Sequence, residues 1–123
     1  MDFEEANPVS DPNGSGGVTT ASALPGWTVT VDGVQQSLVG YNTLFAEGGA
    51  TVTLVGPNNI LPPIDGGYSV GLEGSFGTSG ISQTGLIPVG TESLLVEAVV
   101  LNAQFDVTLG GQTLQPVPLY TAS

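Results

Sequence analysis

Residues 105–115, FDVTLGGQTLQ, restrict the possible folds of this chain more than any other stretch. Gly110 and Gly111 separate two runs of alternating apolar and polar residues, a pattern typical of a β-hairpin with a two-residue turn. Counting outward from the turn places Val107 opposite Leu114. Side chains of a strand point alternately to its two faces, so one face of this hairpin is apolar and needs a core that two strands cannot supply alone. That face consists of Phe105, Val107, Leu109 and Leu114.

Further segments with strand-like patterns lie upstream of this hairpin. In WTVTVDGVQQSL, residues 27–38, Asp32-Gly33 predicts another two-residue turn, which pairs Trp27 with Leu38. We interpret Trp27 as a core residue rather than a sugar-stacking one. The run SLLVEAVVL, residues 93–101, is almost continuously apolar. It predicts a central strand covered on both faces, or a strand whose outer face is covered by a partner. The other expected strands are 50–55, 68–73 and 81–87.

These patterns predict an all-β protein of antiparallel β-sandwich architecture. No segment shows a sustained helical period with capping residues, so we expect essentially no helix. About eight short strands separated by Gly and Pro favour a sandwich of the jelly-roll type. Residues 1–17 are acidic and then rich in turn-forming residues, and we expect a flexible acidic N-terminal arm there. Residues 18–123 are expected to form a single β-sandwich domain.

Charge and composition exclude several classes of function. The 123-residue chain contains no Lys, Arg, His or Cys, and eleven acidic residues give it a net charge of -11. It has no cationic side chain to neutralise phosphates, so we expect no nucleic-acid partner. Because His and Cys are absent, zinc sites, thiolate chemistry and conventional catalytic triads are excluded as well. Paired carboxylates could hydrolyse glycosides, but no motif selects such a pair, and we expect a protein that is not an enzyme. No run approaches the roughly 18 apolar residues of a membrane helix, so we expect no membrane insertion.

The order of several motifs is similar to that of a known family. These motifs are DFE near the start, LPGWTV, PPIDGGYSVGLEG, ISQTGLIPVGTESLLVEA and FDVTLGGQTLQPVPLY. They resemble the galactose-binding-like β-sandwich of bacterial surface proteins that carry a C-terminal PEP-type sorting signal. Family members usually continue past the position of Tyr120 for several strands and contain some Lys and Arg. The resemblance therefore implies an extracellular or cell-surface protein and a jelly roll that lacks, or has shortened, its C-terminal strands.

The same resemblance suggests one metal site. Related sandwiches often hold a structural calcium between the first strand and the loop before the YSV-like strand. The matching acidic positions are Asp2, Glu4 and Asp65, with Glu73 a weaker candidate. Calcium requires about six to eight oxygen ligands, so these carboxylates are either part of such a site or solvated surface charge.

Two non-enzymatic functions remain open. One is a structural, self-associating surface or fibre module, in which another copy covers an open sheet edge and the 93–101 segment. The alternative is a carbohydrate-binding module for an extracellular glycan, which needs an aromatic platform with amide and carboxylate partners. The residues expected to bind such a ligand are Tyr41, Asn42, Asn58, Asn59, Asp65 and Tyr68.

The charge composition predicts that stability falls as the pH rises above about 5 in low salt. Eleven carboxylates without a cationic side chain repel one another more in the compact state. Their folded-state pKa values are then raised, so this contribution favours folding at acidic pH and is lost as the groups ionise. Added salt should restore stability by screening. The check is the melting temperature from pH 4 to pH 7 at two salt concentrations, and a rise over that range would contradict the prediction.

Overall fold

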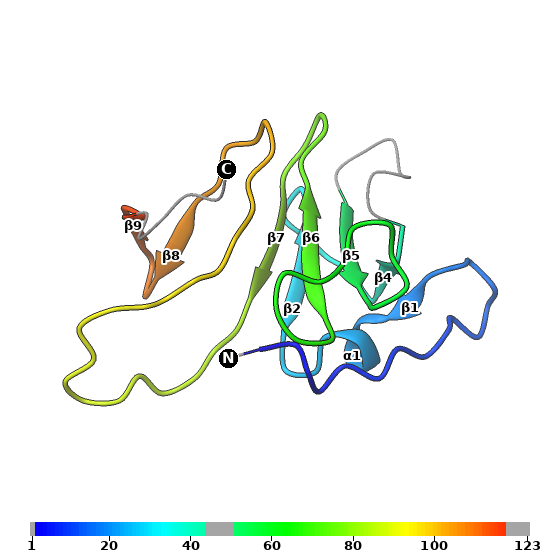
Figure 1. The fold of residues 1–123 in the computed structure, drawn as a ribbon, viewed down its shortest axis with the longest axis horizontal. Helices are drawn as coiled ribbons and strands as arrows, with labels where there is room; N and C mark the ends of the chain where they lie inside the picture. The colour runs from blue at the N-terminus through cyan, green and yellow to red at the C-terminus, as the bar shows by residue number, and fades with distance from the viewer. Residues whose placement is uncertain (1, 44–50, 118–123) are drawn as a thin grey trace.

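The computed structural model describes residues 2–43 and 51–117, which form an all-β protein with one helical turn (Figure 1). Three sheets are present in this part of the chain. The elements are β1 (Val18–Thr19), α1 (Thr20–Ala23), β2 (Thr28–Val31), β3 (Val34–Gln35), β4 (Leu38–Tyr41), β5 (Thr51–Val55), β6 (Ser69–Glu73), β7 (Ser79–Ser82), β8 (Val107–Leu109) and β9 (Gln112–Leu114).

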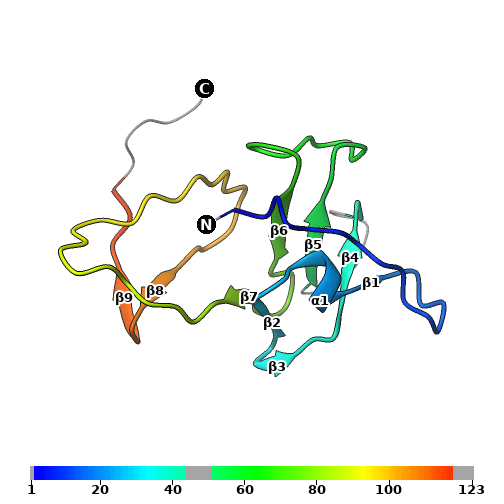
Figure 2. The same ribbon diagram turned by 90° about the horizontal axis from the view of Figure 1, so that it is seen from below.

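Two of the sheets share one hydrophobic core. The first has the strand order β1-β4-β5-β6 and the second the order β3-β2-β7 (Figure 2). Val29 of β2 and Leu54 of β5 are both fully buried, and Leu24, after α1, is buried in the same cluster. Burying these side chains is the dominant stabilising contribution available to the chain, because it has no ion pairs between side chains to add. The other members of the cluster are Val18, Ala23, Val39 and Val52.

Strand β5 is the centre of the larger sheet. It pairs in parallel with β4, where Gly40 lies opposite Thr53, and antiparallel with β6, where Thr53 lies opposite Gly71. The strands predicted at 50–55 and 68–73 are confirmed over Thr51–Val55 and Ser69–Glu73, and Ala50 lies outside the described residues. The parallel pair differs from the antiparallel expectation. Side chains alternate in the same way in parallel and antiparallel strands. The alternation of apolar and polar residues therefore could not determine the direction in which β4 and β5 pair.

Both predicted hairpin turns are confirmed. Asp32 and Gly33 have φ values of 50° and 78° between β2 and β3, and Gly110 and Gly111 have 59° and 81° between β8 and β9. Positive φ at both central positions is the requirement of a type I′ turn, which glycine meets without a steric penalty. The register of the second hairpin is also as predicted, with Val107 opposite Leu114.

The first hairpin is shorter than the sequence indicated. Its ladder ends at Gln35, and Leu38 belongs to the other sheet, where it lies opposite Thr19 of β1. The predicted pairing of Trp27 with Leu38 is therefore wrong. The chain leaves the hairpin early because Val39 of β4 enters the shared core. The helical turn α1 was also not predicted, since four residues are too few to display a helical period.

The prediction of a buried central strand at 93–101 is wrong. These residues form no strand and all of them are exposed; Leu95, for example, is 72% exposed. Of the strand expected at 81–87, only the first two residues are in β7. A continuously apolar run forms a buried strand only when neighbouring strands flank it. Among the described residues no other strand pairs with this run.

The β8–β9 hairpin forms a two-stranded sheet of its own. Figures 1 and 2 show it beside the body, at the end of the long connection that follows β7. Its apolar face was expected to pack on the core, and this is also wrong, because Leu109 is 40% exposed and only Val107 and Leu114 are half-buried. The correct turn and register show that local signals determine a hairpin without determining where it packs.

The N-terminal arm was expected at residues 1–17, and its described part, residues 2–17, makes backbone hydrogen bonds to the body. The backbone N–H of Asn7 donates to the carbonyl of Ser22 at 2.9 Å, and the N–H of Thr19 donates to the carbonyl of Val9 at 2.9 Å. Phe3 and Ala6 pack against the core cluster. The segment therefore lies along α1 and β1.

Asp11 closes a turn within this segment. Its carboxylate accepts hydrogen bonds from the backbone N–H groups of Asn13, at 3.0 Å, and Ser15, at 3.1 Å. Hydrogen bonds from the Ser15 side chain and from Asn13 hold the pKa of Asp11 below its ordinary value of 3.8. Asp11 therefore stabilises the folded protein at pH values above its ordinary pKa. This contribution is lost as the pH falls through the lowered pKa of the folded state. Asp11 thus makes stability rise with pH, whereas the general repulsion between carboxylates makes stability fall with pH.

We predict that Leu54→Ala destabilises the protein by about 2–5 kcal/mol, because it leaves a cavity at the centre of the core. The matched control is Leu109→Ala, which removes the same atoms from the exposed hairpin and should cost less than about 1 kcal/mol. Denaturant unfolding measures both variants. Equal losses would show that the hairpin packs as firmly as β5.

Candidate functional site

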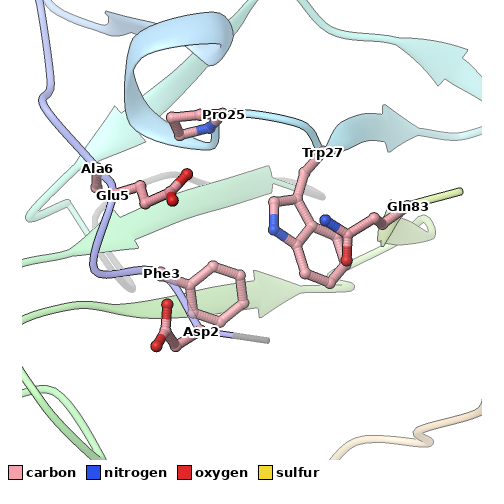
Figure 3. A pocket seen from close by; sticks show the side chains of 7 residues that line it. All are labelled: Asp2, Phe3, Glu5, Ala6, Pro25, Trp27 and Gln83. Atoms are coloured by element: carbon pink, nitrogen blue, oxygen red, sulfur yellow. The ribbon is translucent and has the colours of Figure 1, made fainter. Parts of the chain in front are cut away.

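A cavity of about 260 Å³ lies where the N-terminal segment meets the start of β2 and the end of β7 (Figure 3). Its apolar wall consists of two aromatic rings, Phe3 and Trp27, together with a proline and an alanine. Its polar groups are two carboxylates and one amide. The seven lining residues are Asp2, Phe3, Glu5, Ala6, Pro25, Trp27 and Gln83.

Local backbone structure fixes the position of Trp27. Its N–H donates to the carbonyl of Leu24 at 3.0 Å, across a turn in which Gly26 has a φ of 80°. The ring is tilted by 41° to that of Phe3, with 5.5 Å between the centroids, a separation typical of favourable aromatic pairs. Trp27 is half-buried and packs against the core cluster, as the sequence suggested, but its ring also lines the cavity.

Gln83 reaches the site through strand pairing. Thr28 of β2 lies opposite Ser82 of β7, and one step further along this register brings Gln83 beside Trp27. Figure 3 shows the amide group of Gln83 next to the indole ring. No signal in the sequence connects residues 27 and 83, because only the pairing of β2 with β7 joins them.

Glu4 anchors the segment that carries Phe3 and Glu5. Its carboxylate accepts the N–H of Gly67 at 2.9 and 3.1 Å and the N–H of Tyr68 at 3.1 Å. Gly66 has a φ of 63°, a backbone conformation that favours glycine, and a side chain there would also displace this carboxylate. Hydrogen bonds to an ionised group are stronger than neutral ones, and these hold the N-terminal segment against the loop before β6.

The acidic residues of the suggested calcium site do not come together. Asp2 lies at the aromatic cavity, Glu4 is bonded to backbone amides, and Asp65 is exposed in its loop. Glu73 is buried in β6, opposite Thr51. Within residues 2–43 and 51–117, no three acidic side chains form a group that could hold a metal ion. The N-terminal segment does meet the loop before β6, but through the hydrogen bonds of Glu4 to backbone amides.

The residues expected to bind a glycan lie around the 56–67 loop, and none of them lines the cavity at Trp27. Tyr41 packs on the core, and Asn42 Oδ1 accepts the N–H of Gly56 at 2.7 Å. Asn59 donates its amide N–H to the carbonyl of Leu61, and Asn58 is exposed beside it. Tyr68 packs on the core at the other end of the loop, next to exposed Asp65. Several of these side chains therefore shape the loop.

No protein-family model, curated protein or solved structure matches this chain. In the described part of the chain, no helix has the length and apolar character needed to cross a membrane. The chemistry of the cavity itself is the remaining guide. The chain has no cationic side chain, so no side-chain ion pair competes with a ligand for the carboxylates of Asp2 and Glu5.

Proposed function

We propose that this protein is a non-enzymatic, self-associating structural module of the bacterial cell surface. The observation that carries the proposal is the exposed apolar segment at 84–105, which pairs with no other strand among the described residues. The motifs of the chain resemble those of surface proteins that carry a sorting signal, and this resemblance supports the proposed location at the cell surface. A jelly-roll sandwich of the galactose-binding-like type belongs to the same proposal, supported by the two sheets that share a core.

The amount of exposed apolar surface supports association. Soluble monomers rarely expose contiguous apolar patches of more than a few hundred Å². Within 84–105 the exposed apolar side chains follow one another closely along the chain. They are Leu86, Ile87, Val89, Leu94, Leu95, Val96, Val99, Val100, Leu101 and Phe105.

Open sheet edges supply the complementary half of the contact. Strand β7 is an edge of the three-stranded sheet, and β8 and β9 form a sheet with no third strand in the described part of the chain. Such edges present unpaired backbone N–H and C=O groups that an extended segment can join as a further strand. Each copy offers both an edge and an apolar extended segment, so two copies satisfy each other and no different partner is required. Repulsion between acidic copies makes this contact dependent on salt.

The test is sedimentation velocity from about 0.01 M to 1 M NaCl, over which the Debye length falls from about 30 Å to about 3 Å. We expect an oligomer that grows with salt and is lost in the variant Leu95→Asp/Val99→Asp. The matched control is Ile60→Asp/Phe76→Asp, which adds two charges at exposed apolar positions outside the segment. A monomer at every salt concentration, or an oligomer unaffected by the first variant, would overturn the proposal.

The cavity at Trp27 favours a second function, that of a carbohydrate-binding module for an extracellular glycan. Sugar rings stack on aromatic faces, and their hydroxyl groups bond to carboxylates and amides at the rim. Trp27 and Phe3 supply such faces, while Asp2, Glu5 and Gln83 supply acceptors and a donor. The site differs from the one expected from the sequence, since it uses none of the residues of the 56–67 loop.

Trp27 is the single tryptophan, so its fluorescence reports directly on this site. Glycans selected on an array should shift that emission. Gln83→Ala and Glu5→Ala should each weaken binding about tenfold, equivalent to about 1.4 kcal/mol, while exposed Gln35→Ala in β3 should leave it unchanged. Affinity for a neutral glycan should be insensitive to salt. The absence of array hits, or binding that leaves the emission unchanged, would contradict this function.

A further inference from the structure

The cavity at Trp27 is acidic, a property that recognition of a neutral sugar does not require. Its lining includes the carboxylates of Asp2 and Glu5, both from the N-terminal segment. Figure 3 shows the carboxylate of Glu5 extending from this segment in the direction of Trp27. Asp2 Oδ1 also accepts the backbone N–H of Glu4, but at 3.4 Å this contact is longer than ordinary hydrogen bonds. The chain has no Lys, Arg or His, so no side chain of its own can neutralise this pair.

The aromatic rings of the same cavity favour a ligand of the same charge as the carboxylates do. Trp27 and Phe3 are half-buried, their ring centroids lie 5.5 Å apart and their planes are inclined by 41°. The face of an aromatic ring is electron-rich and attracts a cation within about 6 Å of the ring centre, and Trp attracts it most strongly. Exposed carboxylates alone hold a cation weakly, because water and salt screen them. A cation that also contacts a ring is held by both.

The donor set of the cavity excludes two other kinds of charged ligand. A calcium ion needs about six to eight oxygen ligands, and the rings supply none. In the part of the chain that the structure describes, no three acidic side chains are grouped around a metal position. An anion would meet two carboxylates and no cationic side chain. A primary ammonium group on a carbon skeleton matches both walls, because its N–H groups donate to carboxylates while its carbon atoms pack on the rings.

We infer that the cavity at Trp27 recognises a primary ammonium group, carried by a sugar with a free amine. The volume of about 260 Å³ lies just below that of pockets for drug-sized ligands, which begin at about 300 Å³, and suits a single sugar ring. The sugar as carrier rests on the carbohydrate-binding function proposed above. Recognition of the ammonium group rests on the carboxylates and rings alone.

Glucosamine, N-acetylglucosamine and glucose are matched probes, because only the amine of glucosamine is charged at about pH 6. The emission of Trp27 reports the binding of each sugar. In about 0.01 M NaCl we expect glucosamine to bind about tenfold more tightly than either neutral sugar. The preference should shrink in about 1 M NaCl, where the Debye length is about 3 Å. Equal affinity for the three sugars would overturn the inference.

Variants that remove charge and keep shape locate the preference. Asp2→Asn/Glu5→Gln should bring the affinity for glucosamine to within about twofold of that for N-acetylglucosamine, because the ion pairs are lost. The matched control Glu92→Gln/Asp106→Asn removes two charges at exposed positions outside the cavity and should keep most of the preference. An equal loss in both variants would assign the effect to the general charge of the protein and refute the site.

Two further measurements complete the test. Phe3→Leu keeps an apolar side chain on the cavity wall but removes one ring, and it should weaken glucosamine binding more than glucose binding. All titrations are repeated on protein acetylated at its N-terminus, so that an α-amino group close to Asp2 in sequence cannot compete for the site. A preference that Phe3→Leu leaves unchanged would remove the rings from the inference and contradict it.

Propylammonium and propanol separate this inference from the carbohydrate-binding function. If propylammonium shifts the emission of Trp27 while propanol and all three sugars do not, the cavity recognises ammonium and the carbohydrate-binding function fails. If the neutral sugars bind as tightly as glucosamine, that function stands and the ammonium inference fails. If none of the five probes binds, both are wrong.

Discussion

The hydrophobic cluster that contains Leu54 of β5 and Val29 of β2 is the feature on which the rest of the structure depends, because it joins the two sheets through one core. The strand that carries Leu54 has neighbours on both sides, and its backbone is therefore satisfied in both directions. Around it the chain adds α1, β1 and the N-terminal segment, which cover the same cluster. Among the described residues, none after β7 contributes to this cluster, and that division separates a buried body from an exposed apolar extension.

Negative charge is the second constraint on the molecule. Without Lys, Arg or His, a carboxylate can be stabilised only by hydrogen-bond donors or solvent. Glu4 uses the N–H groups of Gly67 and Tyr68, and Asp11 uses those of Asn13 and Ser15. Both carboxylates thereby organise the N-terminal segment, which in turn carries Phe3 and Glu5 to the cavity at Trp27. Local donors perform the structural role that ion pairs have in other proteins.

The two proposed functions use neighbouring parts of the chain. Gln83 lines the aromatic cavity, and the exposed apolar segment begins at the following residue, Thr84. A second copy that covers 84–105 would therefore bury surface close to the sequence position of Gln83. Surface modules that assemble and also retain sugar would benefit from such proximity, but either function is physically sufficient without the other.

The sequence by itself determined the local features of this protein. Asp32-Gly33 and Gly110-Gly111 specify their turns through the φ values that those residues accept, and alternation then fixes the register around each turn. Strands β5 and β6 were also predictable from the sequence, because they carry short alternating or β-branched patterns. The tertiary structure alone decided which apolar runs are buried. Residues 51–55 lie between two strands, whereas the apolar 93–101 segment pairs with no strand in the described part of the chain. Burial depends on neighbours that no local pattern specifies. The cavity has the same origin, since Trp27 and Gln83 meet only because β2 pairs with β7.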